Sequence, residues 1–410
     1  MTTTLAAAPS TSIGIFLRVG SRYEPDALAG SAHFLEHMLF KGTTHRDARQ
    51  IVWDVESLGG SINAFTSEDH TCYEASGPAD LLPQLAAVLS DIVWHSTLPP
   101  EELEKERLVI LEELTMYEEN PGEHIDDLAS AALWAPHPLG RPILGNVDSL
   151  AAISQDTLSE FYHQHYHRGS HVISVAGPQS HEEVLEIISP LVGPSLGPPS
   201  QPPVPFDRRI VTQPVTKIEH RDIEQTHLSI SFHTEGFNDP QRHARRVFST
   251  LFGETMSSRL FQTLREDLGL CYHVSSSINA YQDTGAFSID AGLDTDRLEK
   301  ALDVFSREIE KVATRSIPTE EVEQAKRYLC GQNIISYETT SSWMSWCGEC
   351  LIAKNQIVDP AELRGEWQKV TPEEISRAAE EIFTAPSALA AISPADERYF
   401  RLQLPAAVLV

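Results

Sequence analysis

Cysteine is scarce in this sequence. Its 410 residues include only 5 cysteines, and such an odd, low count argues against a framework of disulfide bonds. Cys347 and Cys350 form a CxxC pair, but a zinc ribbon needs a second such pair, and the other three cysteines are dispersed singly. We therefore predict buried thiols at this pair rather than a redox or metal role.

Long apolar runs and early basic residues are also missing. No apolar run approaches the roughly 20 residues that a transmembrane helix needs. No Lys or Arg precedes Arg18, so the start of the chain lacks the charged flank of a secretion signal and the Arg-rich pattern of an organellar one. These absences predict a cytoplasmic protein with no membrane span.

Positive charge is in deficit across the chain. There are 31 Lys and Arg residues against 59 Asp and Glu residues, which gives a formal net charge of −28. Such a surface repels the phosphates of nucleic acids, which we exclude as partners, and favours cationic or neutral partners. Solubility is the alternative explanation for the acidic surface, and the charge alone leaves it open.

The chain is long enough for two ordinary domains, and a break lies near its midpoint. Residues 189–214 are rich in Pro and Gly and cannot form a helix or an inner strand. We therefore predict an N-terminal domain at 1–195, a linker at 196–214 and a C-terminal domain at 215–410.

The two predicted domains are similar in sequence. Leu98–Lys105 is echoed by Ile317–Gln324, and Ile15–Pro25 resembles Ile230–Pro240, at separations of about 215–220 residues, so one duplication explains both matches. Each half opens with an alternating strand and continues into helices that carry N-terminal capping signals. Mixed strands and long helices of this kind predict an α+β layer that is repeated twice.

A candidate metal site begins with HFLEH at 33–37, in an apolar stretch that predicts a buried helix. His33 and His37 are four residues apart and project from one helical face, which suits two nitrogen ligands of one metal ion. Glu36 lies close enough to this face for its carboxylate to take a proton from a metal-bound water. The alternative is that two core histidines and a glutamate stand in this order by chance.

A catalytic zinc ion needs a third protein ligand, and a second predicted helix offers candidates. Glu106 and Glu113 are seven residues apart and share one stripe with Val109 and Ile110. Acidic side chains on an apolar stripe are costly to bury unless something pairs with them. Glu112 lies one step round the helix, so this pattern favours Glu113 with Glu106 over Glu112.

The duplication provides an independent test of this set. When the two halves are aligned, the corresponding positions of the second half carry none of the proposed metal groups: Arg245, Phe248, Ser249, Ala325 and Gln332. Polar residues that are present in one copy and jointly absent from the other behave as one functional unit.

The HxxEH motif stands 76 residues before Glu113, and it resembles the inverted zinc-binding motif of the pitrilysin-type (M16) metallopeptidases. The likeness is strongest to their small two-domain branch, which includes the mitochondrial processing peptidase β-subunit and its bacterial homologues. It covers nearly the whole chain and implies two homologous domains, each a mainly antiparallel sheet covered by helices, that pair into a clam-shell. The stretches that carry it are GSRYE at 20–24, HFLEHMLFKGT at 33–43, NAFTSEDHTCYEA at 63–75, PLGRPILG at 138–145 and SSRLFQTLREDLGLCYHVSS at 257–276.

The resemblance implies a zinc-dependent endopeptidase with one Zn²⁺ ion per chain. Its three metal ligands would be His33, His37 and Glu113. Glu36 would activate the attacking water, and Glu106 would orient a ligand histidine. Asn63 and Ala64 would lie on an exposed edge strand, to which an unfolded peptide substrate is added by main-chain pairing.

Two residues of the metal-free half match an Arg/Tyr pair that stabilises the scissile carbonyl in this family. They are Arg265 and Tyr272, whose guanidinium and phenol both donate the hydrogen bonds that a developing oxyanion needs. The alternative is an ion pair of Arg265 with Glu266 or Asp267, and a core position for Tyr272.

In this family four such domains close around a peptide, so a two-domain chain pairs with another chain. Because this chain matches both the metal set and the Arg/Tyr pair, the resemblance implies a homodimer, and an obligate heterodimer is the alternative. A second alternative is a non-catalytic scaffold subunit of the same fold. The presence of all the proposed metal-binding residues argues against it. Basic, unstructured peptides are the expected substrates if acidic side chains line the space in which the four domains enclose the peptide.

Overall fold

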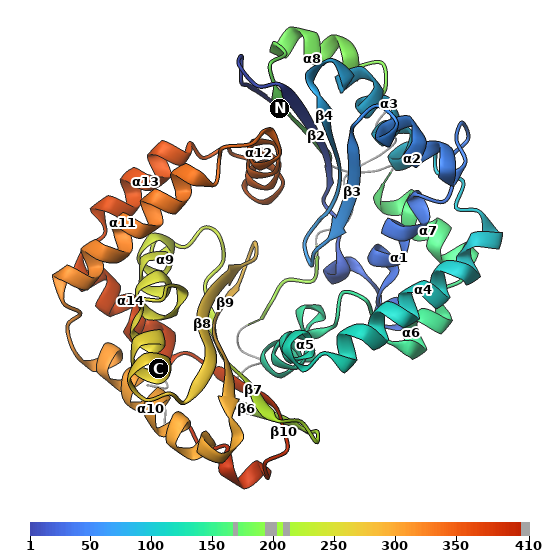
Figure 1. Cartoon of the computed structure of the whole chain (residues 1–410). Coiled ribbons are helices and arrows are strands. Elements are labelled where there is room, and N and C mark those ends of the chain that lie inside the picture. Colours follow the sequence, from blue (N-terminus) through green and yellow to red (C-terminus); the bar gives the residue numbers. More distant parts are fainter. Residues whose placement is uncertain (167–170, 193–202, 208–213, 403–410) are drawn as a thin grey trace. The chain divides into compact units, whose positions relative to one another are not determined.

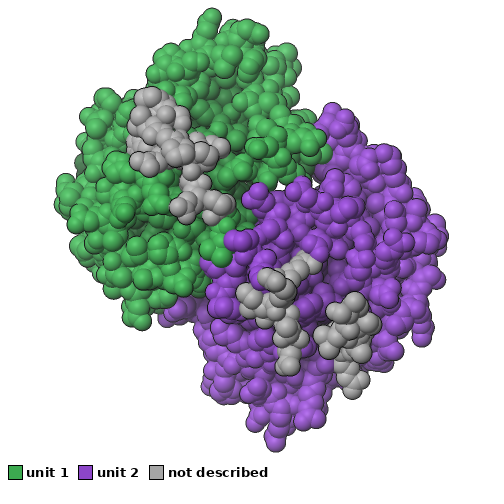
Figure 2. Space-filling model, turned by 180° about the vertical axis from the view of Figure 1, so that it is seen from behind, with its two compact units in different colours: residues 1–116, 141–204, 336–358 green, residues 117–140, 205–335, 359–410 purple. Residues whose placement is uncertain are grey.

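The computed structural model describes residues 1–166, 171–192, 203–207 and 214–402 (Figure 1). The chain divides into two compact units, which Figure 2 colours separately. Unit 1 comprises residues 1–116, 141–204 and 336–358, and unit 2 comprises residues 117–140, 205–335 and 359–410. Each unit therefore combines segments from both halves of the sequence.

Unit 1 contains a five-stranded sheet with the strand order β1-β5-β2-β4-β3. β1 runs parallel to β5, and the other neighbours are antiparallel. The strands are β1 (Thr2–Thr4), β2 (Ser10–Leu17), β3 (Ser61–Thr66), β4 (Thr71–Pro78) and β5 (His171–Gly177). β3 therefore forms one edge of the sheet, and β1 forms the other.

The helices of unit 1 cover both faces of this sheet. Ile15 and Tyr73 point to one face and pack in the main core of the unit, whereas Phe16 and Cys72 point to the other face and pack with Met344. Side chains of successive strand residues alternate in this way because the period of a strand is two. The helices are α1 (Ser31–Leu39), α2 (Ala48–Glu56), α3 (Leu82–His95), α4 (Pro100–Glu119, whose last residues belong to unit 2), α6 (Val147–Ala152), α7 (Gln155–His165), α8 (His181–Ile188) and α12 (Thr340–Lys354).

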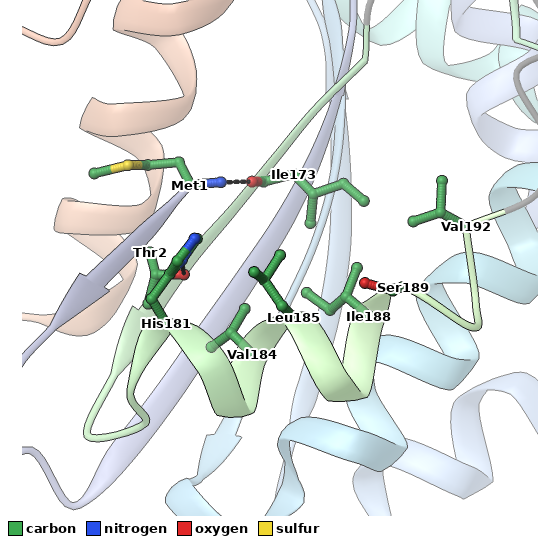
Figure 3. A pocket seen from close by; sticks show the side chains of 9 residues that line it. All are labelled: Met1, Thr2, Ile173, His181, Val184, Leu185, Ile188, Ser189 and Val192. Atoms are coloured by element: carbon green, nitrogen blue, oxygen red, sulfur yellow. Dashed lines mark hydrogen bonds between the residues drawn. The ribbon is translucent and has the colours of Figure 1, made fainter.

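The first residues of the chain are anchored to the sheet through β1 (Figure 3). The amino group of Met1 donates a hydrogen bond to the carbonyl of Ile173 over 2.7 Å, and the hydroxyl of Thr2 bonds with Nδ1 of His181 over 2.9 Å. A cavity of about 450 Å³ lies beside this contact and is lined by Val184 and Leu185 of α8, among others. β1 thus pairs along an edge of β5 that would otherwise be uncovered.

Unit 2 repeats the arrangement of unit 1. Its sheet has the order β6-β10-β7-β9-β8, with β6 parallel to β10 and the other neighbours antiparallel. The strands are β6 (Val215–His220), β7 (Gln225–Thr234), β8 (Cys271–Ala280), β9 (Gly285–Asp294) and β10 (Ser387–Ser393). Because the pattern of strand directions matches that of unit 1, the predicted α+β fold of two homologous, mainly antiparallel domains is confirmed.

The helices of unit 2 include two short π-helical segments besides α-helices. The α-helices are α5 (Pro121–Trp134), α9 (Arg242–Ser249), α10 (Leu298–Thr314), α11 (Thr319–Ile335), α13 (Pro360–Lys369) and α14 (Pro372–Thr384). The π-helical segments are Thr250–Glu254 and Phe261–Asp267. Single 3₁₀ turns lie at Ser21–Tyr23, Asp26–Leu28 and Ala79–Leu81 in unit 1 and at Pro138–Gly140, Thr295–Arg297 and Glu397–Tyr399 in unit 2.

One helix of each unit comes from the other half of the chain. α12 packs on β2 and β5 of unit 1, and α5 packs on β7 and β10 of unit 2 (Figure 1). In unit 1 the hydroxyl of Ser174 donates a hydrogen bond to the carbonyl of Met344 over 2.8 Å. The compact units therefore do not follow the contiguous halves of the chain. Most of the predicted linker lies outside the described residues, and the domain boundaries stay a prediction.

The described helices and cysteines can be compared with two of the sequence predictions. No helix among them is both long and apolar enough to cross a bilayer. All five cysteines are free thiols, and Cys347 and Cys350 are buried in α12. The cytoplasmic location stays a prediction.

α12 approaches the sheet so closely that Gly348 leaves no room for a side chain. A Cβ atom at this position would lie 2.0 Å from Cε2 of Phe16, whose ring is fully buried. We expect Gly348→Ala to destabilise unit 1 by on the order of 1–3 kcal/mol, because overpacking forces the ring or the helix to shift. Thermal unfolding followed by circular dichroism measures this loss.

Gly331→Ala in α11 is the matched control. A Cβ atom at Gly331 would meet nothing within 4 Å, so the greater helix propensity of alanine should leave this variant as stable as the unmodified chain or slightly more stable. Equal unfolding temperatures for Gly348→Ala and Gly331→Ala would contradict the close packing of α12.

Candidate metal centre

The candidate metal centre begins on α1, which is the buried helix that the HFLEH stretch predicts. His33 and His37 lie one turn apart on this helix, and their ring centroids are 4.7 Å apart. Phe34 and Leu35, between them in sequence, are fully buried in the core of unit 1. The apolar side chains thus fix α1 against the core while the two imidazoles share another face.

Glu113 of α4 brings a carboxylate to the two imidazoles. Its Oε2 lies 3.7 Å from Nε2 of His33 and 3.5 Å from Nε2 of His37. One donor atom from each of these residues lies within 4.8 Å of the others, and no other group of this kind occurs in the described part of the chain. Because ligand atoms about 2.0–2.1 Å from a tetrahedral zinc ion stand about 3.3 Å apart, the three atoms fit zinc after a small adjustment.

The exposure of α4 agrees with most of the predicted stripe. Glu106 and Ile110 are buried and Glu113 is partly buried, whereas Glu112 is exposed. Val109 was expected on the buried stripe, but it is 49% exposed. It lies about 60° round the helix from Glu106, which places it at the border of the stripe.

Glu106 connects the two helices behind the proposed ligands. One carboxylate oxygen lies 3.2 Å from Nδ1 of His37, and the other lies 2.7 Å from Nζ of Lys41. Because Nδ1 of His37 is engaged by Glu106, its Nε2 is left to face Glu113. Lys41, in the turn that follows α1, has no predicted role in the sequence, since the charge that it pairs with lies far along the chain on α4.

Glu36 lies beside the three convergent residues without being one of them. The hydroxyl of Thr66, the last residue of β3, donates a hydrogen bond of 2.6 Å to its carboxylate. Burial raises the pKa of Glu36, and the hydrogen bond from Thr66 and the charge of His37 oppose this effect. Thr66 belongs to the stretch NAFTSEDHTCYEA at 63–75, but no spacing rule identifies it as the partner of Glu36.

The two histidines differ in their surroundings. Burial and the neighbouring charge of His37 lower the pKa of His33 to about 4, although Glu113 acts in the opposite direction. Burial also acts to lower the pKa of His37, but hydrogen bonds with Glu113 and Glu106 outweigh it, and the pKa is raised. Nδ1 of His33 is buried and has no hydrogen-bond partner among the described residues.

β3 is the strand of the sheet that lies nearest to this centre. Its residues pair only with β4, with Asn63 opposite Glu74 and Ala64 opposite Tyr73, so its other edge faces no strand of the described chain. Thr66 ties the end of the strand to Glu36. An extended peptide that paired with this edge would therefore run toward Glu36.

Arg265 and Tyr272 lie together in unit 2. The guanidinium carbon of Arg265 lies 5.7 Å from the ring centroid of Tyr272. Tyr272 is the extra residue of a β-bulge at the start of β8 and is 77% exposed, so the core position considered for it is wrong. No ion pair joins Arg265 to Glu266 or Asp267 among the described residues. The guanidinium of Arg265 also lies over the ring of Phe261, 4.6 Å from its centroid, so neither the ion pair nor the core position that the sequence left open is present among the described residues.

Two family models match the chain in succession. The model described as "Insulinase (Peptidase family M16)" matches residues 2–147, and the model described as "Peptidase M16 inactive domain" matches residues 152–329. The first match contains the three convergent residues, and the second contains Arg265 and Tyr272.

Similar proteins and structures agree with these models. An uncharacterized zinc protease of Mycobacterium leprae is 34% identical over 95% of this chain and 88% of its own, and the uncharacterized zinc protease YmxG of Bacillus subtilis is 35% identical over 94% and 93%. The crystal structure of a peptidase M16 inactive domain from Pseudomonas fluorescens has a TM-score of 0.87 at 20% identity, covering 96% of this chain and 95% of its own. The structure of a protease from Helicobacter pylori has the same TM-score at 21% identity, with 96% of each chain covered. The fold, the two model matches and these relatives together place the chain in the M16 family of peptidases.

Proposed function

We propose that the chain is a zinc-dependent endopeptidase that hydrolyses unfolded peptides. The observation that carries this proposal is the convergence of His33, His37 and Glu113, with Glu36 beside them. Relatives that are named zinc proteases support it, because their likeness covers nearly the whole chain.

In this proposal Nε2 of His33, Nε2 of His37 and a carboxylate oxygen of Glu113 hold one zinc ion. When bound, the ion supplies a Lewis acid that polarises the scissile carbonyl and makes water a stronger nucleophile at neutral pH. Glu36 takes the proton from the attacking water and returns it to the leaving amine, and burial strengthens it as a base by raising its pKa. Thr66 holds the Glu36 carboxylate in place through its hydrogen bond.

The peptide substrate would lie along the unpaired edge of β3, bound through the main chain at Asn63 and Ala64. Arg265 and Tyr272 would donate hydrogen bonds to the oxyanion that develops at the scissile carbonyl. The exposure of Tyr272 supports this role, since a core tyrosine would be out of reach of a substrate. The net charge of −28 favours basic, unstructured peptides over acidic ones.

The proposed assembly is a homodimer in which Arg265 and Tyr272 serve the metal centre of the partner chain. The presence of both groups of residues in one chain supports it, because neither subunit then depends on a different protein. A heterodimer subunit or a non-catalytic scaffold of the same fold is the alternative, and the model that matches the second half describes an inactive domain.

Replacing the proposed base tests the function directly. We expect Glu36→Gln to retain zinc but to lose at least about 100-fold in kcat/KM, because a general base contributes about 10²–10⁴-fold. The measurement is cleavage of a quenched, unstructured basic peptide, with zinc content determined on the same samples. Glu56→Gln, at the exposed end of α2, is the control and should keep full activity. Cleavage by Glu36→Gln at the unmodified rate would contradict the mechanism, and zinc without cleavage in the unmodified chain would favour the scaffold or heterodimer.

Glu106 should affect metal binding although it is not a ligand. We expect Glu106→Gln to weaken zinc binding by about 10- to 100-fold, because it disturbs the contact that orients His37 and leaves Lys41 without its counter-charge. Competition with a chromophoric chelator measures the dissociation constant. Glu102→Gln removes a surface pair with Lys105 on the same helix and should change nothing. Equal zinc affinity for the two variants would show that Glu106 does not orient the histidine.

Subunit mixing tests whether the Arg/Tyr pair acts in trans. Tyr272→Ala and Glu36→Gln should each be nearly inactive alone, since each lacks one part of the catalytic set. After verified subunit exchange, a mixture of the two should regain a fraction of the activity, because some dimers then contain one complete site. No recovery would rule out the trans arrangement.

A further inference from the structure

Two of the sequence stretches that the metal centre does not use meet at the N-terminal end of α1. GSRYE at 20–24 ends in Glu24, and PLGRPILG at 138–145 contains Arg141. Nη2 of Arg141 donates hydrogen bonds to the carbonyls of Ser21 and Glu24 over 3.3 and 3.0 Å, and its Nη1 pairs with Asp26 over 2.8 Å. Arg141 thus fastens the segment that precedes α1.

The Glu24 carboxylate caps α1 from outside the helix. Its Oε2 accepts a hydrogen bond of 2.8 Å from the amide of Gly30, and its Oε1 accepts one of 2.6 Å from the amide of Ala32. The N-cap residue, Gly30, has no side chain to do this, and the first turn contains no acidic residue. A carboxylate in this place satisfies two unpaired amides and opposes the positive end of the helix dipole.

Glu24 is buried, which keeps its side chain in contact with these amides. The residue is only 5% exposed, so its side chain lies inside the protein. Burial raises the pKa of Glu24 to about 8, while the hydrogen bonds from Ala32 and Gly30 and the charge of Arg141 act in the opposite direction. Each carboxylate oxygen accepts one amide hydrogen bond, and these bonds favour the ionised form that burial disfavours.

The backbone around the start of α1 leaves little freedom to move. Gly30 has a φ of +95°, and a Cβ atom there would lie 2.6 Å from the carbonyl oxygen of Leu144. Gly145 has a φ of +77°, and a Cβ atom there would lie 2.3 Å from the carbonyl oxygen of Ala29. The two chain segments are therefore in contact through their main chains, and both depend on glycine.

His33 is the proposed ligand that depends most on this end of the helix. It is the third residue of α1 and lies in the first turn, where helices fray. His37 is held by Glu106 through Nδ1, but Nδ1 of His33 has no hydrogen-bond partner among the described residues. The direction of the His33 imidazole is thus set by the backbone to which it is attached and by its packing.

We propose that Glu24 is a positioning residue of the metal centre, which caps α1 so that His33 points toward Glu113. Glu24 does for His33, through the main chain, what Glu106 does for His37 through its side chain. Arg141 contributes by fastening the segment that presents Glu24. This inference rests on the proposed metal centre, and it assigns a function to two motif stretches that hold no ligand.

Metal binding by capping variants tests the proposal. We expect Glu24→Ala to weaken zinc binding by about 10- to 100-fold, as loss of an orienting contact does at other metal sites. The absorption spectrum of the Co²⁺-substituted protein should also change, because the spectrum reports the ligand geometry directly. Glu24→Gln keeps one accepting oxygen and the size of the side chain, so it should fall between Glu24→Ala and the unmodified chain. It also supplies the measurement if Glu24→Ala does not fold.

Asp47→Ala is the control for a loss of stability alone. Asp47 caps α2, which carries no proposed ligand, by accepting a 2.8 Å hydrogen bond from the amide of Gln50. Its loss should lower the unfolding temperature of the metal-free protein but leave zinc affinity within about twofold of the unmodified value. Unmodified zinc affinity and Co²⁺ spectra in both Glu24 variants, or changes no larger than those of Asp47→Ala, would overturn the positioning role alone. Failure of the unmodified chain to bind either metal would overturn the proposed function as well.

Discussion

The convergence of one carboxylate and two imidazole nitrogens is the constraint on which the account depends. The three atoms come from two helices, α1 and α4, so they meet only if the helices keep their rotation and separation. Several contacts that are otherwise hard to explain serve this end. Glu106 joins α4 to His37 and Lys41, and Thr66 joins the end of β3 to Glu36. Burying this many ionisable groups is costly unless they are paired, and a bound cation would offset part of that cost.

The second unit shows the same scaffold without the proposed metal ligands. At the position that corresponds to His33 it has Arg245, which is buried and pairs with Asp239 and Glu381. At the position of Glu106 it has Ala325, which is also buried. These positions lie inside the fold in both units, so they must be filled either by a functional group with partners or by a structural contact. Corresponding positions thus carry a proposed metal ligand in one unit and a buried ion pair in the other.

The spacing of the HxxEH motif and the stripe on α4 predicted which face of each helix carries the candidate groups, because both patterns depend on local helix geometry. The prediction that these two faces meet came from the family resemblance. The exclusion of Glu112 follows from the same geometry, and the misplacement of Val109 marks its limit. Lys41, Thr66 and Glu24 were beyond prediction, since each acts on a partner that only the folded chain brings close. The exchange of α5 and α12 between the units was equally hidden, because Ser174 and Met344 touch across 170 residues and leave no periodic signal. The exposure of Tyr272 depends on a one-residue bulge, which alternation in a strand does not reveal.

Locating the metal ion itself would test the proposed metal centre most directly. Crystals of the zinc-loaded protein, measured on both sides of the zinc absorption edge, would show any bound zinc as a peak in the anomalous difference map. We predict one such peak per chain, about 2.0–2.2 Å from Nε2 of His33, Nε2 of His37 and a carboxylate oxygen of Glu113. Fully loaded crystals with no peak there, or with zinc bound only elsewhere, would contradict it.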